Sequence, residues 1–388
     1  MHSHYDVLGV EPHAQPEEVR SAYHRLARSY HPDLNPDPHA HEHMARINVA
    51  FEVLSDPVRR MEYDSSLGRT VMIEPERAPR EATDPDSIQA RIIHRHRAHK
   101  TPIYSVGFQP HSTRLVSSSF DNEIIWWGTG ASMIERRQKL EGGVVSPLQP
   151  LSSGRVVAAG STEQSLACWT VGEGKYDVWR QTPKEWICCL RPSPDGQSLA
   201  MGQVDSFLRV VSVTSGVLRW QTKAHLESVT ALAWSSDSSF VATGAADAMV
   251  KIWCGTTGRE LHQLIKIRST VTALAFSPDG RWLAVAAVDL SIRVFDLRDL
   301  SLRHTFFGHS KPIESLAFHP RSWLLGSASR DGTLRLWNVK FGIGHGVIEA
   351  SHQPQASIAF SGEGNLLASG GLDKVIRVWQ LHQPAKGD

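Results

Sequence analysis

The sequence is poor in cysteine and has no long hydrophobic run. Cys168, Cys188, Cys189 and Cys254 are its only cysteines, and their spacing matches neither a disulfide framework nor a metal-ligand motif. A reducing compartment is therefore expected. No apolar run approaches the length that a membrane span needs. The first module begins almost at Met1, which leaves no room for a signal peptide, so the sequence predicts a cytoplasmic protein.

A strong excess of charge is also missing. The 41 Lys and Arg against 40 Asp and Glu give a net charge of +1. Residues 1–67 hold six basic and eleven acidic residues, a net charge of −5, so the remainder carries +6. Neither part is basic enough to make nucleic acid the default partner. The length allows two or three domains, and most of the 12 tryptophans lie beyond residue 125, which indicates a repeated aromatic role there.

A short amphipathic segment near the N-terminus is what the chain does have. Its apolar residues recur at helical spacing and predict a helix over residues 16–30: Val19, Ala22, Tyr23, Leu26, Ala27 and Tyr30. Arg20, His24 and Arg28 line the other side. The helix should end near Pro32, which leaves His31-Pro32-Asp33 at a solvent-facing bend. A second periodic segment, residues 44–54, predicts an antiparallel helical hairpin.

This N-terminal module resembles a J domain, the DnaJ-type cochaperone module. The resemblance is carried by His4-Tyr5-Asp6-Val7-Leu8-Gly9-Val10, Tyr30-His31-Pro32-Asp33, Ala50-Phe51-Glu52-Val53-Leu54-Ser55-Asp56-Pro57 and Tyr63-Asp64. It implies that His31, Pro32 and Asp33 trigger ATP hydrolysis by a DnaK-type chaperone. It also implies that this chaperone docks on the helix face formed by Arg20, His24, Arg25 and Arg28. Such a protein is a cochaperone and not itself an enzyme.

Two residues depart from the usual pattern of that family. His24 stands where lysine is common, and Leu34 stands where a basic residue usually follows the motif. Both changes weaken the expected charge attraction to the chaperone. The alternative function is therefore a non-catalytic interaction scaffold whose J domain no longer stimulates ATP hydrolysis. A catalytic role for His31 and Asp33 is disfavoured, because no nucleophile or orienting partner lies nearby in the sequence.

From residue 99 onward the chain repeats with a step of 42 residues. We call the acids at this step the repeat acids: Asp121, Glu163, Asp205, Asp247, Asp289, Asp331 and Asp373. Six residues after them stand Trp127, Trp169, Val211, Trp253, Phe295, Trp337 and Trp379. Seven such units predict an all-β, seven-bladed β-propeller of the WD-repeat type. In one unit we expect strands over residues 271–276, 282–286 and 292–295.

The repeat acids have recurring polar partners in the sequence. WD-repeat proteins resemble this pattern through a hydrogen-bonded tetrad of Asp, His, Ser or Thr, and Trp. By this resemblance the complete tetrads are His99-Ser117-Asp121-Trp127, His225-Thr243-Asp247-Trp253 and His309-Ser327-Asp331-Trp337. Three copies of one Asp-His pair around a ring favour a structural role over a catalytic dyad. The second, third and fifth units lack the histidine and are expected to depend more on packing.

The sequence predicts a multidomain chain: a small all-α J domain over residues 1–67, a flexible linker over 68–87 and the propeller over 88–383. The last unit has too few residues for its outer strand. Residues 88–96 precede His99 much as the outer strand of another unit precedes His309, so they are predicted to close the last blade.

The residue before each repeat acid is expected on one face of the ring, as a partner face for a client or targeting protein: Phe120, Thr162, Val204, Ala246, Val288, Arg330 and Leu372. This set is mostly apolar, which favours a protein partner. The basic run over residues 91–100 is better explained as a strand than as a phosphate site. His39, His41 and His43 lack the spacing of a closed metal site, so no metal or cofactor is predicted.

Overall fold

The computed structural model describes residues 3–11, 14, 16–30, 40–55, 60, 63, 88–109, 112–128, 134–139, 144–150, 155–160, 166–170, 177–181, 183–264, 267 and 269–382. The chain divides into two compact units, Met1–Arg77 and Ala78–Asp388. The linker expected over 68–87 lies outside the described residues. The finer boundaries at residues 67, 87 and 383 stay predictions.

The N-terminal unit is helical, with α1 (His4–Leu8), α2 (Pro16–Ser29) and α3 (Ala40–Ser55). Ser3 caps α1 by accepting a hydrogen bond from the Asp6 amide, and the Asp6 carboxylate accepts one from the Ser3 amide in return. Gly9 ends the helix in the left-handed conformation, with φ of 65°. The amphipathic pattern thus gives α2, which ends three residues before Pro32.

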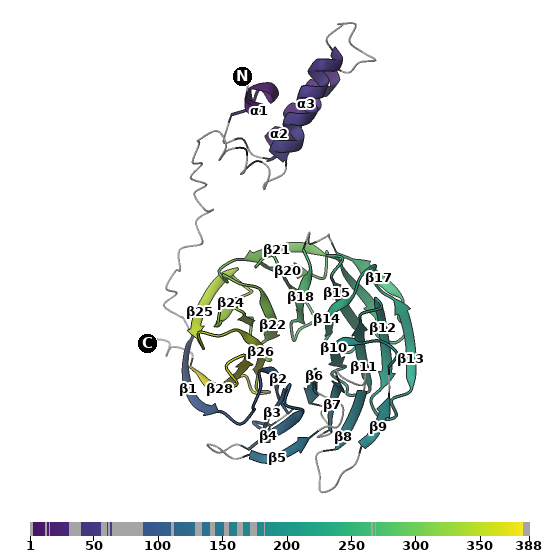
Figure 1. The fold of residues 1–388 in the computed structure, drawn as a ribbon, viewed down its shortest axis with the longest axis vertical. Helices are drawn as coiled ribbons and strands as arrows, with labels where there is room; N and C mark the ends of the chain where they lie inside the picture. The colour runs from purple at the N-terminus through teal and green to yellow at the C-terminus, as the bar shows by residue number, and fades with distance from the viewer. Residues whose placement is uncertain are drawn as a thin grey trace. The chain divides into compact units, whose positions relative to one another are not determined.

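The C-terminal unit is a ring of antiparallel four-stranded sheets (Figure 1). Within the described residues there are seven such sheets. The first four hold β2 (Ile103–Phe108), β3 (Leu115–Ser119), β4 (Glu123–Trp127) and β5 (Ile134–Lys139); β6 (Val144–Pro150), β7 (Arg155–Gly160), β8 (Leu166–Thr170) and β9 (Asp177–Gln181); β10 (Ile187–Pro192), β11 (Ser198–Gln203), β12 (Phe207–Ser212) and β13 (Leu218–Lys223); and β14 (Val229–Trp234), β15 (Phe240–Ala245), β16 (Val250–Cys254) and β17 (Glu260–Gln263).

The other three sheets continue the ring. They hold β18 (Val271–Phe276), β19 (Trp282–Ala287), β20 (Ile292–Asp296) and β21 (Ser301–Phe306); β22 (Ile313–Phe318), β23 (Leu324–Ser329), β24 (Thr333–Asn338) and β25 (Ile343–Glu349); and β26 (Gln355–Phe360), β27 (Leu366–Gly371) and β28 (Ile376–His382) with β1 (Gln89–His96). The chain therefore carries a β-propeller, as the repeat predicts. The strands expected over 271–276, 282–286 and 292–295 are β18, β19 and β20, with ends displaced by at most one residue.

The core lies between neighbouring sheets. All six residues of β19 are buried, because this second strand is covered on both faces by the sheets beside it. One cluster joins Val271 and Leu283 of one sheet to Ile252 of the sheet before it. Each sheet thus exposes its apolar surface unless a neighbour covers it, and the ring is stabilised through these contacts between sheets.

The first strand of the propeller completes its last sheet. β1 pairs antiparallel with β28, from Gln89 opposite His382 to His96 opposite Ile376. This is the place predicted for residues 88–96. The buried ring of His96 also stacks on Trp127 of the next sheet, with centroids 4.6 Å apart. The edge of β28 is therefore covered by a strand from the other end of the propeller sequence.

Candidate functional sites

Helices α2 and α3, which precede and follow His31-Pro32-Asp33 in the sequence, pack against each other. Val19 of α2 and Ile47 of α3 are buried in one apolar cluster, together with Tyr5 of α1. The rings of Tyr23 and Phe51 stack with centroids 4.1 Å apart, and the Tyr23 hydroxyl donates to the Asn48 side chain. The apolar face predicted for the first helix is thus the face that packs on the second.

The predicted docking face is described only in part. Arg25 is exposed on α2. Arg20, His24 and Arg28 belong to the same helix, and their side chains lie outside the described residues, as do His31, Pro32, Asp33 and Leu34 entirely. The backbone places Arg25 and Arg28 within one turn of α2, and the motif follows the end of this helix by two residues.

Another basic residue of this unit has a structural role. Arg60 Nε donates to the Tyr5 hydroxyl at 2.9 Å, and its guanidinium lies 5.3 Å from the centroid of the same ring. The Tyr63 hydroxyl accepts a hydrogen bond from the His4 amide at 2.8 Å. These contacts attach the C-terminal end of the J-domain sequence to α1.

The structure brings together the four residues of the first predicted tetrad. His99 Nδ1 lies 3.0 Å from an Asp121 carboxylate oxygen, and His99 Nε2 lies 2.8 Å from the Ser117 hydroxyl oxygen. The Trp127 indole donates to the same hydroxyl at 2.9 Å. The carboxylate also accepts from the amides of Lys100 and Glu123. The polar groups of the tetrad thus satisfy one another between strands, as expected of a structural network.

The other two predicted tetrads repeat this geometry. The distances from His Nε2 to the hydroxyl are 2.7 Å for His225 to Thr243 and 2.7 Å for His309 to Ser327. Burial lowers the pKa of His99 and of His225 despite their neighbouring carboxylates, so both rings are neutral at pH 7. Hydrogen bonds from His309 and Thr333 hold the pKa of the Asp331 carboxyl below its usual range, although burial opposes them.

The repeat acids without a tetrad histidine have a partner that the sequence reasoning missed. The seventh unit also lacks the histidine, because Ser351 stands at that place. In three of these units an arginine four residues later pairs with the acid: Asp205 with Arg209 at 2.9 Å, Asp289 with Arg293 at 2.6 Å and Asp373 with Arg377 at 2.6 Å. In the third and fifth units an ion pair is thus present where the tetrad is absent, and the expectation that these units depend more on packing stays a prediction. Glu163 of the second unit lies outside the described residues.

The predicted partner face is marked by a repeated backbone contact. The amide before a repeat acid donates to the carbonyl just before the innermost strand of its sheet, as from Val204 to Trp186 and from Val288 to Thr270, both at 3.0 Å. Ala246, Arg330 and Leu372 make the same contact. Phe120, Val204 and Val288 are about half exposed, and Thr162 lies outside the described residues.

Sequence reasoning missed three further residues at this rim. Trp186 is 52% exposed beside Val204, and the Tyr104 ring meets the Phe120 ring edge-on at 4.3 Å. Glu314 forms an ion pair with Arg330. Tyr104 and Glu314 occupy the same place in their repeats, two residues into the unit's first strand region, so the 42-residue step would have found them once extended to that place.

Comparison with known proteins agrees with both parts of this description. A DnaJ domain model matches residues 3–64, and a WD domain, G-beta repeat model matches residues 90–128, 216–254, 259–296, 300–338 and 346–380. A J domain is fused to WD repeats. The two sequence resemblances are thereby confirmed at the level of the module.

The J domain is similar to chaperone proteins of bacteria. It is 56% identical over 61 residues to "Chaperone protein DnaJ" of Dictyoglomus thermophilum, which covers 16% of each chain. It is 52% identical over 64 residues to the protein of that name from Leifsonia xyli, covering 16% of this chain and 17% of the relative. "Chaperone protein DnaJ 1" of Aquifex aeolicus is 52% identical over 66 residues, covering 17% and 18%. The chain thus spans about a sixth of the length of these relatives.

Two features are absent from the described residues. None of the helices there is both long and apolar enough to cross a membrane. No group of three His, Cys, Asp or Glu side chains in the described part is placed to hold a metal ion. His39 and the side chain of His41 lie outside that part.

Proposed function

We propose that this chain is a cochaperone that recruits a DnaK-type chaperone and stimulates its ATP hydrolysis through the J domain. The observation that carries this proposal is a matched J domain over residues 3–64 that retains His31-Pro32-Asp33 between the paired helices α2 and α3. The exposed Arg25 supports a docking role for α2. In this proposal the chain acts in the cytoplasm, needs no cofactor and is not itself an enzyme.

Stimulated ATP hydrolysis tests this function against the scaffold alternative. The DnaK-type chaperone from the same host should hydrolyse ATP several times faster when this chain is added, and the His31→Gln variant should give no acceleration. An Arg60→Lys variant serves as control and should accelerate hydrolysis as the unmodified chain does, because Arg60 contacts Tyr5 within the J domain and lysine keeps its charge. Binding of the chaperone without acceleration would support the scaffold and overturn the cochaperone.

The proposed role of the propeller is a seven-bladed platform that brings a client or a location to the J domain. The 42-residue step and the four-stranded sheets support seven blades. We place its partner face at Phe120, Val204, Val288 and Trp186, because these exposed apolar side chains lie where the innermost strands begin. Apolar and aromatic side chains of this kind are typical anchors for protein partners.

Paired variants test this face. Phe120→Ser combined with Val204→Ser should lose proteins that the unmodified chain captures from extracts of its host. Phe341→Ser is the matched control, because Phe341 is 65% exposed beyond the third strand of its sheet, away from the partner face. Equal capture by all three chains would contradict the proposed face.

A further inference from the structure

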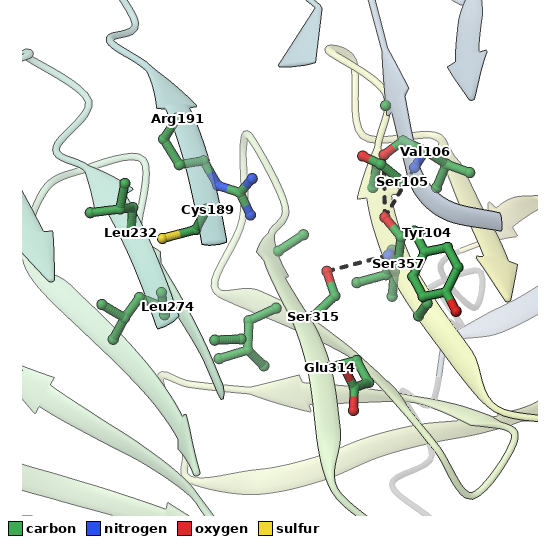
Figure 2. A pocket seen from close by; sticks show the side chains of 18 of the residues that line it. Tyr104, Ser105, Val106, Cys189, Arg191, Leu232, Leu274, Glu314, Ser315 and Ser357 are labelled. Carbon is green, nitrogen blue, oxygen red and sulfur yellow. Dashed lines mark hydrogen bonds between the residues drawn. The ribbon is translucent and has the colours of Figure 1, made fainter. Parts of the chain in front are cut away.

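The propeller encloses a central cavity of about 490 Å³. It is lined by the innermost strands of the sheets, among them β10, β14, β18, β22 and β26 (Figure 2). Small and medium side chains make up most of the lining, with leucines such as Leu232 and Leu274 beside hydroxyl groups such as those of Ser315 and Ser357. Because neutral polar groups are common in this lining, a charged side chain there is the feature that would select a ligand.

Arg191 is the exception in this lining. The 42-residue step places it in register with Gly107, Gln149, Ala233, Ala275, Ala317 and Ala359. At five of these positions the residue is alanine or glycine, which fill little of the cavity. Arg191 instead extends a guanidinium from β10 into the space that the inner strands enclose (Figure 2). Its presence is not required by the blade architecture, because the other repeats form the same strand without it.

The charge of Arg191 has no acidic partner among the described residues that line the cavity. Its guanidinium donates to the carbonyl of Leu190 at 3.1 Å. Glu314 is the one carboxylate in this described lining, and it is already paired with Arg330 at the rim. Burial lowers the pKa of Arg191, which shows that its charge is poorly solvated. A partly buried guanidinium without a counter-charge is poorly stabilised, and an anion that enters the cavity would offset that cost.

The neighbouring thiols do not supply this anion. Burial raises the pKa of both Cys188 and Cys189, so each stays protonated near pH 7. Cys189 Sγ lies 3.4 Å from the Val229 carbonyl oxygen as a weak donor. Arg191 is therefore the one charged side chain of the described lining that has no opposite charge beside it.

We propose that the central cavity is a binding site for a carboxylate-bearing ligand, with Arg191 as its anchor. A guanidinium fork matches a carboxylate through two parallel hydrogen bonds. One cation balances a singly charged carboxylate, whereas a phosphate would leave excess negative charge in a cavity with no second described cation. The mixed lining, with leucines such as Leu232 and hydroxyls such as that of Ser315, fits a short aliphatic or peptide portion of the same ligand.

Calorimetric titration of the full chain tests this site. The probes are sodium propionate, acetyl-Gly-Ala-Ala with a free carboxylate, and the same peptide as its amide, each at ionic strength matched with sodium chloride. We expect the carboxylate probes to bind and the amide not to bind. Binding of propionate assigns the site to small free carboxylates, and binding of the free peptide alone assigns it to a chain terminus.

Two variants make the result specific to Arg191. Arg191→Ala installs the residue that four other repeats carry, so the fold should persist, and we expect at least tenfold weaker carboxylate binding. Without ligand this variant should melt at a higher temperature, because an unpaired, partly buried charge is removed from the cavity lining. Arg259→Ala removes one exposed positive charge outside the cavity lining and should change neither result. Absence of carboxylate binding, or equal binding by Arg191→Ala, overturns the proposal.

Discussion

In each tetrad a single hydroxyl group is hydrogen-bonded to both the histidine ring and the tryptophan ring. The Thr243 hydroxyl is fully buried, receives the Trp253 indole N–H at 2.8 Å and lies 2.7 Å from His225 Nε2. It therefore satisfies the hydrogen-bonding groups of two buried rings. Loss of such a group leaves its partners buried without a hydrogen bond, which costs about 1–3 kcal/mol for each.

Removing this hydroxyl should destabilise the propeller without changing its shape. Thr243→Val keeps the side-chain volume but leaves the His225 and Trp253 rings without their hydrogen-bond partner. We therefore expect the free energy of unfolding to fall by about 2–4 kcal/mol. Thr305→Val is the matched control, because Thr305 is exposed on β21. Denaturant unfolding of both variants measures the difference. Equal loss in the two would contradict the role given to the tetrad.

The tetrad histidines should also make stability depend on pH. Burial lowers the pKa of His99 and His225 below the usual 6.5, so the unfolded chain binds protons at a pH where the folded rings stay neutral. Their contribution is therefore full above pH 6.5 and is lost as the pH falls from there towards the folded pKa. We expect the propeller's Tm to fall between about pH 7.5 and 5.5.

A histidine variant isolates this effect. His225→Gln should reduce the slope of unfolding free energy against pH by up to about 1.4 kcal/mol per pH unit. His262→Gln, which removes an exposed imidazole from β17, should leave the slope unchanged. A Tm that stays constant or rises as the pH falls would contradict the neutral, buried state of the tetrad rings.

Residue identity predicted the tetrads well and the ion pairs poorly. A fixed spacing identified His99, Ser117 and Asp121 as partners because the fold repeats their geometry. Arg209, Arg293 and Arg377 also recur, but the tetrad pattern includes no residue four positions after the repeat acid. Arg191 occurs in one repeat alone, so no repetition pointed to it.

At the scale of the element, closure of the ring depends on strand β1. β28 would be an edge strand without it, with unpaired backbone groups along its length. β1 also brings apolar residues such as Ile92 and Ile93 to the clusters on its two sides. Closure therefore depends on pairing between residues that are nearly 300 positions apart in the sequence.

Replacing β1 should open the ring to local unfolding. We expect Gln89–His96 exchanged for a Gly/Ser sequence of equal length to lower Tm by about 10 °C, since a loss of several kcal/mol shifts Tm by a few degrees for each. The control exchanges residues 80–87 in the same way and should melt as the unmodified chain does. An unchanged Tm after replacement of β1 would contradict the closure.

Strand positions were predictable because the period fixed them, whereas backbone detail was not. The strands over 271–295 lie within one residue of expectation. The turn after each described repeat acid contains a left-handed residue, and in one unit this residue is Leu290 with φ of 68°. Leucine gives no signal for that conformation, which the surrounding strands impose.

At the scale of the whole molecule, the proposed function combines a local trigger with a surface for partners. The J domain supplies His31-Pro32-Asp33, and the propeller supplies exposed apolar residues around a cavity. The modules were predictable because each has a sequence signature over its full length. The partner of the propeller was not predictable, because the fold does not determine which exposed side chains lie at the rim.

Single-turnover ATP hydrolysis by the host's DnaK-type chaperone tests the central claim most directly. The account predicts several-fold acceleration by the unmodified chain and none by His31→Gln. It also predicts greater acceleration by His24→Lys combined with Leu34→Lys, because both changes restore positive charge to the docking region. An unmodified chain that binds the chaperone but leaves its hydrolysis rate unchanged would contradict the account.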